Sequence, residues 1–546
     1  MMTIFQIGFC VCSGIFLYTG YLYCYSYLWH PLQDIAGPPV DKVLGNTLNP
    51  VLNPFHSSRI HELYVQKYGR SVRIQGIGPL DQRLLTLDPT SVAHVLKNSN
   101  IYEKPWQSRR MITSLIGCGM LAAEGLVHKR QRRVCTPAFS IQNLRALVPL
   151  VFEKGQQLKQ RWSHLAQDQS VTLDVCHWIS RATFDVIGVA GFEYDFNAIQ
   201  DESNELFLAY KEMFEVAISQ GNSVRNIIRI YAPFLDLIIP DETYRTIQRC
   251  QGVIRRVAGR LIQEKKAKIL QGHLDGVPYS GRDLLSLLLK SNSAVDLPAD
   301  QRISDEDILH NVNTFMFAGS DTSSLSLTWA LFLLAQNPAI QSRLRTELLG
   351  IAPLSSVASL TEEEIQSLHA VISDLPFLDN VVRESIRLVP PVHSSIRVAT
   401  QDDEIPTSYP VYNRDGTVST RNSVSISKGS FVHVAVEGFS LDKEFWGQDA
   451  WEFQPDRWDH LSDQAKDLPG IFSNTLAFSA GPRSCIGVRF SMIEIKTFLY
   501  TLLTNFVFEP TEDRIIRANV VLTRPYIAGK YKQGSQLPLK VKPFVA

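Results

Sequence analysis

The stretch from Ser304 to Gln336 predicts one helix of unusual length, and this helix constrains the architecture more than any other feature. Ser304-Asp305-Glu306-Asp307 is typical of a capped helix start, and Asn337-Pro338 is a clear stop. Apolar residues recur along it at the spacing of one buried stripe: Ile308, Val312, Phe315, Met316, Leu327, Leu331 and Leu334. About 32 residues at about 1.5 Å each give a rod of roughly 48 Å, which crosses a whole domain. The chain is therefore expected to build one large body around a central helix.

The remaining patterns add more helices and a smaller β part. Helical periodicity is present in four further stretches: Arg145–Ala166, Leu206–Ser219, Asp241–Gln271 and Leu375–Leu388. Strands are predicted in three: Ser71–Ile77 and Arg83–Leu87, a hairpin around Gly78-Pro79, and Ser423–Val436, with a turn at Lys428-Gly429. Surface loops are predicted near 272–282, 291–302 and 402–422. No solenoid-length repeat or low-complexity linker divides the chain. We therefore predict a single mainly α body with a minor β part over residues 37–546.

Composition and charge set limits on the compartment and on partners. Lys plus Arg and Asp plus Glu number 54 each, so bulk charge argues neither for nor against a nucleic-acid partner, and none is expected. Hydrophobic residues make up 45% of the chain, which is normal for a protein that buries a sizeable core. The eight cysteines form no CxxC pair and no dense cluster, which suits a reducing compartment. Cys485 is therefore available for a role other than a disulfide.

Residues 1–36 predict a membrane anchor followed by a stiff hinge. Met1–Gln33 contains no Asp, Glu, Lys or Arg, and Ile4–Trp29 is mostly apolar. Because about 20 apolar residues suffice to span a bilayer as a helix, this segment is long enough to do so. The end of this segment resembles an interfacial aromatic belt: Tyr21, Tyr23, Tyr25, Tyr27 and Trp29. The alternative is a cleaved signal peptide, but a basic start and a small-residue cleavage site are missing. His30-Pro31 and Gly37-Pro38-Pro39 cannot continue a helix, so they are expected to form the stiff hinge between the anchor and the body. Basic residues appear only after the segment, which favours a cytosolic body.

A short loop near the carboxyl end, Phe478–Gly487, surrounds a single cysteine. Glycines at 481 and 487 let the backbone approach an atom closely and direct amide donors at a sulfur. Arg483 adds positive charge, which favours a thiolate. A lone cysteine is more often a small buried hydrophobic residue, so the loop needs support from other motifs.

Those motifs are present. The loop reproduces the FxxGxRxCxG pattern of the cytochrome P-450 superfamily, and three further segments stand in that family's order. Glu384-Ser385-Ile386-Arg387 resembles its ExxR motif, and Phe453–Trp458 resembles its FxPxRW segment. Ala318-Gly319-Ser320-Asp321-Thr322 resembles its oxygen-activating AGxDT stretch. The resemblance covers about Gly37 to Lys530 and is strongest to fungal microsomal, reductase-dependent members. It implies the helix-rich haem-thiolate fold of that family.

The resemblance also implies haem b as the cofactor, with the Cys485 thiolate as the axial ligand of iron. Such a ligand pushes electron density onto iron and favours O–O cleavage. Phe478 is expected in the haem-binding loop. Four residues are expected on the haem propionates: Arg132, Arg397, Arg483 and His128, which stands where the family more often has Trp. Each basic residue taken alone is more often a solvated surface charge.

Glu384, Arg387 and Arg457 are expected to support the fold and retain haem. Glu384 and Arg387 lie three residues apart on one helical face and can pair, and the FxPxRW segment brings Arg457 to them. The alternative is an ordinary surface pair, worth a few tenths of a kcal/mol. The order of the motifs favours a buried structural triad.

Asp321 and Thr322 are expected to deliver protons to iron-bound dioxygen. General acid chemistry needs a titratable group within hydrogen-bond reach or one water away. Gly319 is expected to open the helix where dioxygen must fit. The structural alternative is a glycine for close packing and a solvated acid.

Two rival functions are a non-oxidative haem-thiolate isomerase or dehydratase, whose members often lack the acid–Thr pair, and a haem sensor, which does not need it. The pair favours a monooxygenase.

Such an enzyme combines O2, a hydrophobic substrate and electrons. No flavin or nicotinamide domain is fused, so NADPH-derived electrons are expected from a separate NADPH–cytochrome reductase, with cytochrome b5 as a further donor. The reductase is expected to dock on a basic face formed by Lys129, Arg130, Arg133 and Arg489. The expected substrate is a terpenoid or sterol-like specialised metabolite, with fatty acids and xenobiotics as alternatives. The anchor predicts a single-pass protein in contact with lipid of the endoplasmic reticulum membrane, its catalytic domain facing the cytosol.

Overall fold

The computed structural model describes residues 13–14, 16–18, 20–21, 24, 30–40, 46–53, 55–76, 81–219, 240–275, 281, 283–293, 298, 301–351, 359–519 and 521–545. The chain divides into two units. Unit 1 comprises Met1–Pro105, His393–Ala450 and Ser462–Ser484, and unit 2 comprises Trp106–Val392, Trp451–Leu461 and Cys485–Ala546. Each unit is described by itself, and the single body over residues 37–546 stays a prediction.

Unit 2 is built mainly from helices. They are α5 (Trp106–Ile116), α6 (Gly125–Cys135), α7 (Ile141–Ala166), α8 (Val175–Phe192), α9 (Glu205–Ser219), α12 (Glu242–Leu274), α13 (Leu284–Ser293), α14 (Asp305–Gln336), α15 (Pro338–Leu349), α16 (Glu362–Asp374), α17 (Pro376–Leu388) and α21 (Val488–Leu503). Short 3-10 turns follow at η1 (Thr136–Phe139), η4 (Pro455–Asp459) and η7 (Tyr531–Gln533). All five predicted helices are confirmed, with ends displaced by a few residues.

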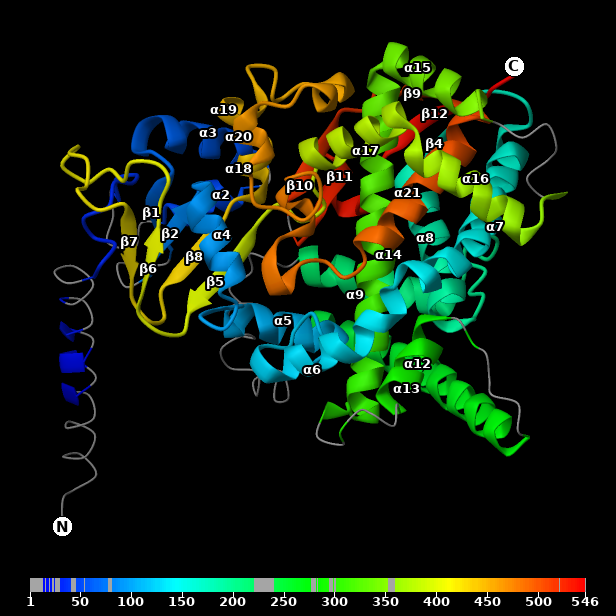
Figure 1. Ribbon diagram of the computed structural model, residues 1–546, viewed down its shortest axis with the longest axis horizontal. Helices are drawn as coiled ribbons and strands as arrows, with labels where there is room; N and C mark the ends of the chain where they lie inside the picture. Colours follow the sequence, from blue (N-terminus) through cyan, green and yellow to red (C-terminus); the bar gives the residue numbers. More distant parts are fainter. Residues whose placement is uncertain are drawn as a thin grey trace. The chain divides into compact units, whose positions relative to one another are not determined.

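The predicted rod is α14, the long green helix of Figure 1. Ser304 and Asp307 form a reciprocal capping box at its start, as expected, and Asn337 caps its end before Pro338 opens α15. Near its carboxyl end, Trp329 Nε1 donates to the Thr523 carbonyl at 2.9 Å. α14 packs on α8 along its middle and also contacts α17 and α21. These contacts cover the rod, so residues on several of its faces are buried.

Among the helices that were not predicted, α8 and α21 share one physical reason. In α8 nearly every side chain is buried, including the polar Arg181, Thr183 and Asp185. The second half of α21 is buried on all sides in the same way. A helix covered all round shows no alternation between a polar and an apolar face. Periodicity therefore carries little signal for these two helices.

The β part of unit 2 forms two small sheets. One has the strand order β4 (Val171–Asp174), β12 (Pro538–Pro543), β9 (Phe506–Pro510), all antiparallel. Trp162 of α7 packs edge-on against the rings of Phe506 and Phe508, with centroids 5.8 and 6.1 Å apart. The other sheet is the antiparallel pair β10 (Ile515–Asn519) and β11 (Thr523–Ile527). This pair places Arg524 near the candidate site described below.

Unit 1 contains a five-stranded sheet (Figure 1). Its order is β1 (Ser71–Gln75), β2 (Gln82–Thr86), β8 (Phe431–Val434), β5 (Ser395–Ala399), β3 (Tyr102–Glu103), and a separate pair joins β6 (Asp403–Pro406) to β7 (Ser423–Ile426). Its helices are α2 (Leu48–Leu52), α3 (Ser57–Tyr68), α4 (Pro89–Lys97), α18 (Val436–Ser440), α19 (Lys443–Trp446) and α20 (Asp463–Lys466). Two 3-10 turns complete it: η5 (Leu476–Phe478) and η6 (Gly481–Arg483).

The strand predictions for unit 1 are confirmed in part. β1 and β2 pair antiparallel, as the hairpin prediction required. The stretch Ser423–Val436 is β, with Gly429 at φ +89° in its turn, but its two strands enter different sheets. The loop predicted near 402–422 is wrong over β6, because residues 403–406 pair with β7. Strand pairing of this kind is not visible in the sequence because the partner strands are about twenty residues apart.

The predicted anchor, Ile4–Trp29, lies mostly outside the described residues. Among the residues that the structure does describe, none of the helices combines the length and apolar character needed to cross a bilayer. The proline hinge is described and is held to unit 1, since Ala36 accepts a hydrogen bond from the Arg73 N–H at 2.9 Å. The anchor itself stays a prediction.

Candidate active site

Cys485, the candidate iron ligand, stands directly before α21. Its side chain is exposed, although the protein around it desolvates the thiol and raises its pKa. The Gly487 N–H and the nearby Arg132 guanidinium act in the opposite direction and lower the pKa. The sulfur therefore faces an accessible space and has an amide donor and a cation beside it. Both groups favour a thiolate.

Two other cysteines of unit 2 contrast with it. Cys135 and Cys176 are buried, and burial raises the pKa of each thiol to about 12. Thiolate formation is therefore unfavourable at both. Cys485 differs because its sulfur is accessible and because a backbone donor offsets the desolvation.

The two glycines of the cysteine loop have different reasons to be glycine. Gly481 has φ +68°, and a Cβ there would lie 2.4 Å from the Leu96 carbonyl oxygen of α4. Any side chain at 481 is therefore strained and displaced. A Cβ on Gly487 would lie 3.9 Å from Cys485 Sγ, an ordinary contact distance. Gly481 thus approaches the backbone of α4 closely, whereas Gly487 lies against the Cys485 sulfur and directs its N–H at it.

Helix α6 carries the two candidate propionate residues of unit 2. His128 is buried and Arg132 is half-buried, and the two lie four residues apart on one face of the helix. Burial lowers the pKa of Arg132, and the neighbouring Cys485 and Cys135 thiols partly offset this. Two other basic residues of the helix contact different groups: Arg133 bonds to Gln301, and Arg130 Nη2 lies 3.9 Å from Asp307 Oδ2.

The remaining candidate haem contacts belong to unit 1. Arg397 is buried on β5 and donates to Ser395 Oγ at 2.6 Å and to the Ile396 carbonyl at 2.9 Å. Phe478 packs edge-on against Phe472, with ring centroids 5.1 Å apart. Arg483 ends η6 and is half-buried. Because these three lie in unit 1 and Cys485 lies in unit 2, their meeting at one haem stays a prediction.

The structure brings Glu384, Arg387 and Arg457 together inside unit 2. Arg387 donates two hydrogen bonds of 2.8 Å to the Glu384 carboxylate, and both side chains are fully buried. Arg457 Nε lies 3.3 Å from Glu384 Oε1. Two further donors complete the cluster: the Gln454 N–H at 3.0 Å and Trp458 Nε1 at 3.1 Å. The surface-pair alternative is thus wrong, since four groups satisfy one buried carboxylate.

Thr322 and Gly319 lie in the middle of α14. The Thr322 hydroxyl donates to the Ala318 carbonyl at 2.8 Å. A carbonyl oxygen has two lone pairs, so it can accept this bond in addition to the helical one, and such a bond can bend a helix slightly. Gly319 faces α8 instead, where a Cβ would lie 2.9 Å from Ile187 Cδ1. Gly319 therefore permits close packing of two helices, as the structural alternative requires, and the expectation that it makes room for dioxygen stays a prediction.

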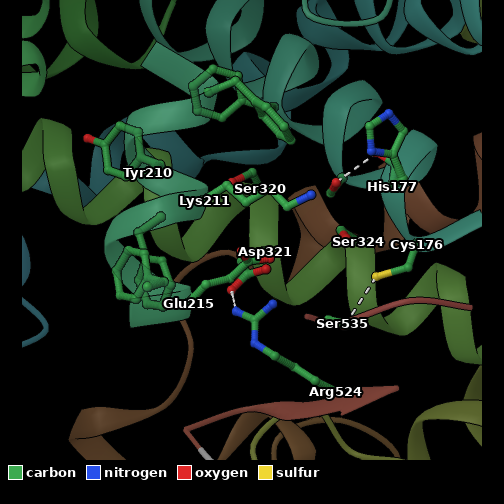
Figure 2. A pocket seen from close by; sticks show the side chains of 15 residues that line it. Cys176, His177, Tyr210, Lys211, Glu215, Ser320, Asp321, Ser324, Arg524 and Ser535 are labelled. Atoms are coloured by element: carbon green, nitrogen blue, oxygen red, sulfur yellow. Dashed lines mark hydrogen bonds and ion pairs between the residues drawn. The ribbon is translucent and has the colours of Figure 1, made fainter. Parts of the chain in front are cut away.

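Asp321 lines a solvent-open pocket, with about 690 Å³ of empty space, between α8, α9, α14 and β11 (Figure 2). Its carboxylate points at the Arg524 guanidinium and pairs with it. Burial alone would lower the pKa of Arg524, but Asp321 raises it above its usual value. Asp321 is therefore partnered, not merely solvated.

Glu215 and Lys211 of α9 were missed by the sequence reasoning and also line this pocket. Burial raises the pKa of Glu215, while Lys211 and Arg524 lower it. The sequence did indicate that Asp321 needs a cationic partner, since a carboxylate within a buried helical stripe is costly unless a cation pairs with it. The identity of that cation was not available, because Arg524 is 203 residues away in the chain.

Comparison with known proteins decides the family. The cytochrome P-450 family matches residues 38–526 of the chain. This chain belongs to the cytochrome P-450 family. A cytochrome P-450 monooxygenase of Postia placenta, number 128, is 37% identical over 527 residues, covering 94% of this chain and 93% of its own. Two further relatives are a ganoderic acid synthetase of Ganoderma lucidum, 31% identical with 94% of each chain covered, and monooxygenase claQ of Ampulloclitocybe clavipes, 30% identical with 88% of each covered.

The chain is therefore a cytochrome P-450 monooxygenase, and the predicted resemblance is confirmed. Membership implies haem with thiolate ligation and the use of O2. The residues fit such a group at Cys485, where an accessible sulfur stands beside the Gly487 N–H and Arg132. The isomerase, dehydratase and haem-sensor alternatives are set aside.

Proposed function

We propose that this cytochrome P-450 inserts one oxygen atom from O2 into a hydrophobic small molecule, with the Cys485 thiolate as the only protein ligand of haem iron. The observation that carries the assignment is the setting of the sulfur, which is exposed, receives the Gly487 N–H and lies near Arg132. When bound, haem supplies the oxygen-activating chemistry that an axial thiolate promotes. The protein's own residues bind it, orient it and move protons.

Four residues are proposed for the propionates: His128, Arg132, Arg397 and Arg483. The support for Arg132 is the desolvation of its guanidinium, since a partly desolvated cation is stabilised by a carboxylate placed beside it. Arg397 already has its guanidinium positioned by Ser395. Phe478 is proposed as an apolar wall of the same loop. Glu384, Arg387 and Arg457 are proposed to support the fold and retain haem, not to take part in the chemistry.

Asp321 and Thr322 are proposed to carry protons to the oxygen-binding side of haem. Thr322 holds its hydroxyl on α14 through the Ala318 carbonyl, and Asp321 reaches a pocket open to solvent. Arg524 keeps Asp321 at that pocket. A proton taken from water there can pass to Asp321 and then along α14 to Thr322, directly or through one water.

The substrate is proposed to be a terpenoid or sterol-like metabolite. Support comes from the named relative of Ganoderma lucidum, which is a ganoderic acid synthetase, so ganoderic acids and their precursors are the first compounds to screen. Electrons are proposed to come from an NADPH-dependent reductase, with cytochrome b5 as a further donor. Docking is proposed on Lys129, Arg130, Arg133 and Arg489, of which all but Arg130 are exposed. The protein is proposed to sit in the endoplasmic reticulum membrane through residues 1–36, with its catalytic part in the cytosol.

The proposed function is tested by co-expression of the full chain with a microsomal reductase. The ferrous carbonyl complex should show the red-shifted Soret band of thiolate ligation, and Cys485→Ser should lose it. Cys118→Ser is the matched control, because Cys118 is also exposed but lies outside the loop. Apolar candidates are then screened for substrate-induced spectral shifts and for products heavier by one oxygen. Retention of the Soret band in Cys485→Ser would overturn the assignment.

A further inference from the structure

A second pocket of unit 2, the α5 pocket, lies between α5, the loop that follows it, and the first turns of α6 and α14. It opens to solvent and has about 1020 Å³ of empty space. It shares no lining residue with the pocket that contains Asp321. A space of this size accommodates a hydrophobic small molecule.

One face of α5 lines this pocket. Trp106, Arg109, Arg110 and Thr113 all belong to the lining, and their spacing of three or four residues places them on one side of the helix. Small apolar side chains from the following segment also contribute: Ala122, Ala123 and Val127. The pocket therefore combines an apolar surface, which includes the exposed indole of Trp106, with two guanidinium groups.

The two arginines are not neutralised by the protein. Among the described residues, Arg109 Nε is buried without a hydrogen-bond acceptor, and neither Arg109 nor Arg110 forms an ion pair. By contrast, Arg130 at the same end of the molecule lies 3.9 Å from Asp307 Oδ2. A partly desolvated guanidinium without an acid beside it is stabilised by any anion that reaches it.

The two acids that line the α5 pocket are engaged with other groups. Asp307 Oδ2 accepts from the N–H and the hydroxyl of Ser304 in the capping box, and Asp307 Oδ1 accepts from Gln131 Nε2 at 3.1 Å. Glu124 takes part in an interaction of its own. The charge that remains without a partner in the pocket is therefore positive, and it favours an anionic ligand.

The loop between α5 and α6 is held against α14. The Met120 N–H donates to Asn311 Oδ1 at 3.0 Å. Gly119 lies so close to α14 that a Cβ there would clash with Thr314 Oγ1 and with the His310 carbonyl. This wall of the pocket is thus formed in advance, which reduces the entropic cost of binding a ligand.

We propose that the substrate carries a carboxylate, which Arg109 binds with the assistance of Arg110, while the hydrocarbon body lies on Trp106 and the small apolar side chains. A guanidinium pairs with a carboxylate through charge-assisted and often bidentate hydrogen bonds, so a hydrophobic acid binds more tightly than its uncharged ester. That this ligand is the substrate rests on the proposed function. The preference of the pocket for an anion does not, because it depends only on side chains of unit 2.

Binding is tested by isothermal titration calorimetry of the haem-loaded full chain with two matched pairs: oleanolic acid and its methyl ester, and lauric acid and methyl laurate. In at least one pair the acid should bind the parent about 10- to 100-fold more tightly than the ester, the range expected for hydrogen bonds to a charged group. This advantage should shrink as the salt concentration rises. Equal affinity within both pairs, or no binding of either acid, would overturn the proposal.

Arg109→Gln should remove most of the advantage of the acid, with the affinity for the ester and the haem content unchanged. Arg145→Gln, at an exposed position of α7 outside the pocket, is the matched control and should keep the advantage. If the Gln variant does not fold, Arg109→Met takes its place, because it keeps the apolar stem and removes the charge. A folded variant that retains the full advantage would overturn the role of Arg109.

A haem propionate is the other source of a carboxylate for these arginines. It offers the guanidinium the same chemistry as a substrate acid, so haem content separates the two. A fall in the haem content of Arg109→Gln, with no fall in Arg145→Gln, would assign Arg109 to a propionate and would overturn the proposal.

Turnover separates this inference from the proposed function. With the reductase, the acid that binds more tightly should give a product heavier by one oxygen, and its ester should give less. Acids that bind with the expected advantage but are not oxidised, while other apolar compounds are, would overturn the substrate assignment alone. A parent without the red-shifted Soret band would instead overturn the proposed function, and the calorimetry would still decide whether the α5 pocket prefers an anion.

Discussion

Arg524 of β11 pairs with Asp321 of α14, although 203 residues separate them in the chain. The pair joins the β10–β11 hairpin of unit 2 to the middle of the 32-residue helix α14. It also holds the Asp321 carboxylate in a pocket that is open to solvent (Figure 2). The same ion pair therefore links β11 to α14 and positions the carboxylate that is proposed to take up protons.

Arg524→Gln should lower the free energy of unfolding by about 2 kcal/mol. Removing one member of a fully buried pair costs about 3 to 5 kcal/mol. The smaller value is expected here because the Arg524 and Asp321 side chains retain 13% and 18% exposure, so solvent screens part of the loss. Chemical denaturation of the haem-loaded protein measures it. Arg524→Lys, which keeps the charge, should recover part of the stability, and a Gln variant as stable as the parent would show that the pair contributes little.

Thr322→Ala should leave haem content and reduction unchanged while more of the consumed NADPH ends as hydrogen peroxide. Asp321→Asn should slow turnover by about 10² to 10⁴, the usual effect of losing a general acid or base. Thr314→Ala is a matched control, because the Thr314 hydroxyl makes the same kind of bond, 2.9 Å to the His310 carbonyl of α14. Product formed per NADPH consumed decides the question. A purely structural role predicts lost haem with unchanged coupling in the protein that survives.

Glu384→Gln should destabilise the protein by about 3 to 5 kcal/mol, because Arg387 is left buried without its anion. Arg387→Lys should also lose stability, since a lysine cannot make the two parallel bonds to Glu384. Haem content and denaturant midpoints measure both effects. Asp456→Asn is the control: its pair with Arg343 is about half-exposed, so it should change stability by less than about 1 kcal/mol. Equal effects at the two sites would contradict the prediction.

Glu494→Gln should change how stability depends on pH. Burial raises the pKa of Glu494 from 4.5 to about 8, so in this window the unfolded chain releases its proton while the folded protein keeps it. The free energy of unfolding of the parent therefore falls with rising pH, by up to about 1.4 kcal/mol per pH unit from this group. The Gln variant lacks this contribution. The free energy of unfolding of the Gln variant relative to the parent should stay constant below pH 4.5, rise between pH 4.5 and about 8, and level off above that. A difference in unfolding free energy that does not change with pH would contradict this prediction.

The sequence by itself determined the features that depend on neighbours in the chain. The capping box at Ser304, the stop at Asn337 and the face shared by Glu384 and Arg387 all follow from spacings of three or four residues. The ten-residue loop around Cys485 identified the family in the same way, because its motif is contiguous. Such features survive in any fold that contains the segment.

Only the tertiary structure decided which surfaces meet. It paired Asp321 with Arg524, turned Gly319 toward Ile187, separated the strands of Ser423–Val436 into two sheets and buried Glu494 beside Ser323. Local periodicity shows that a face is buried, but not which distant segment covers it. Those partners are selected by packing and by loop closure over long separations, which no spacing within one segment contains.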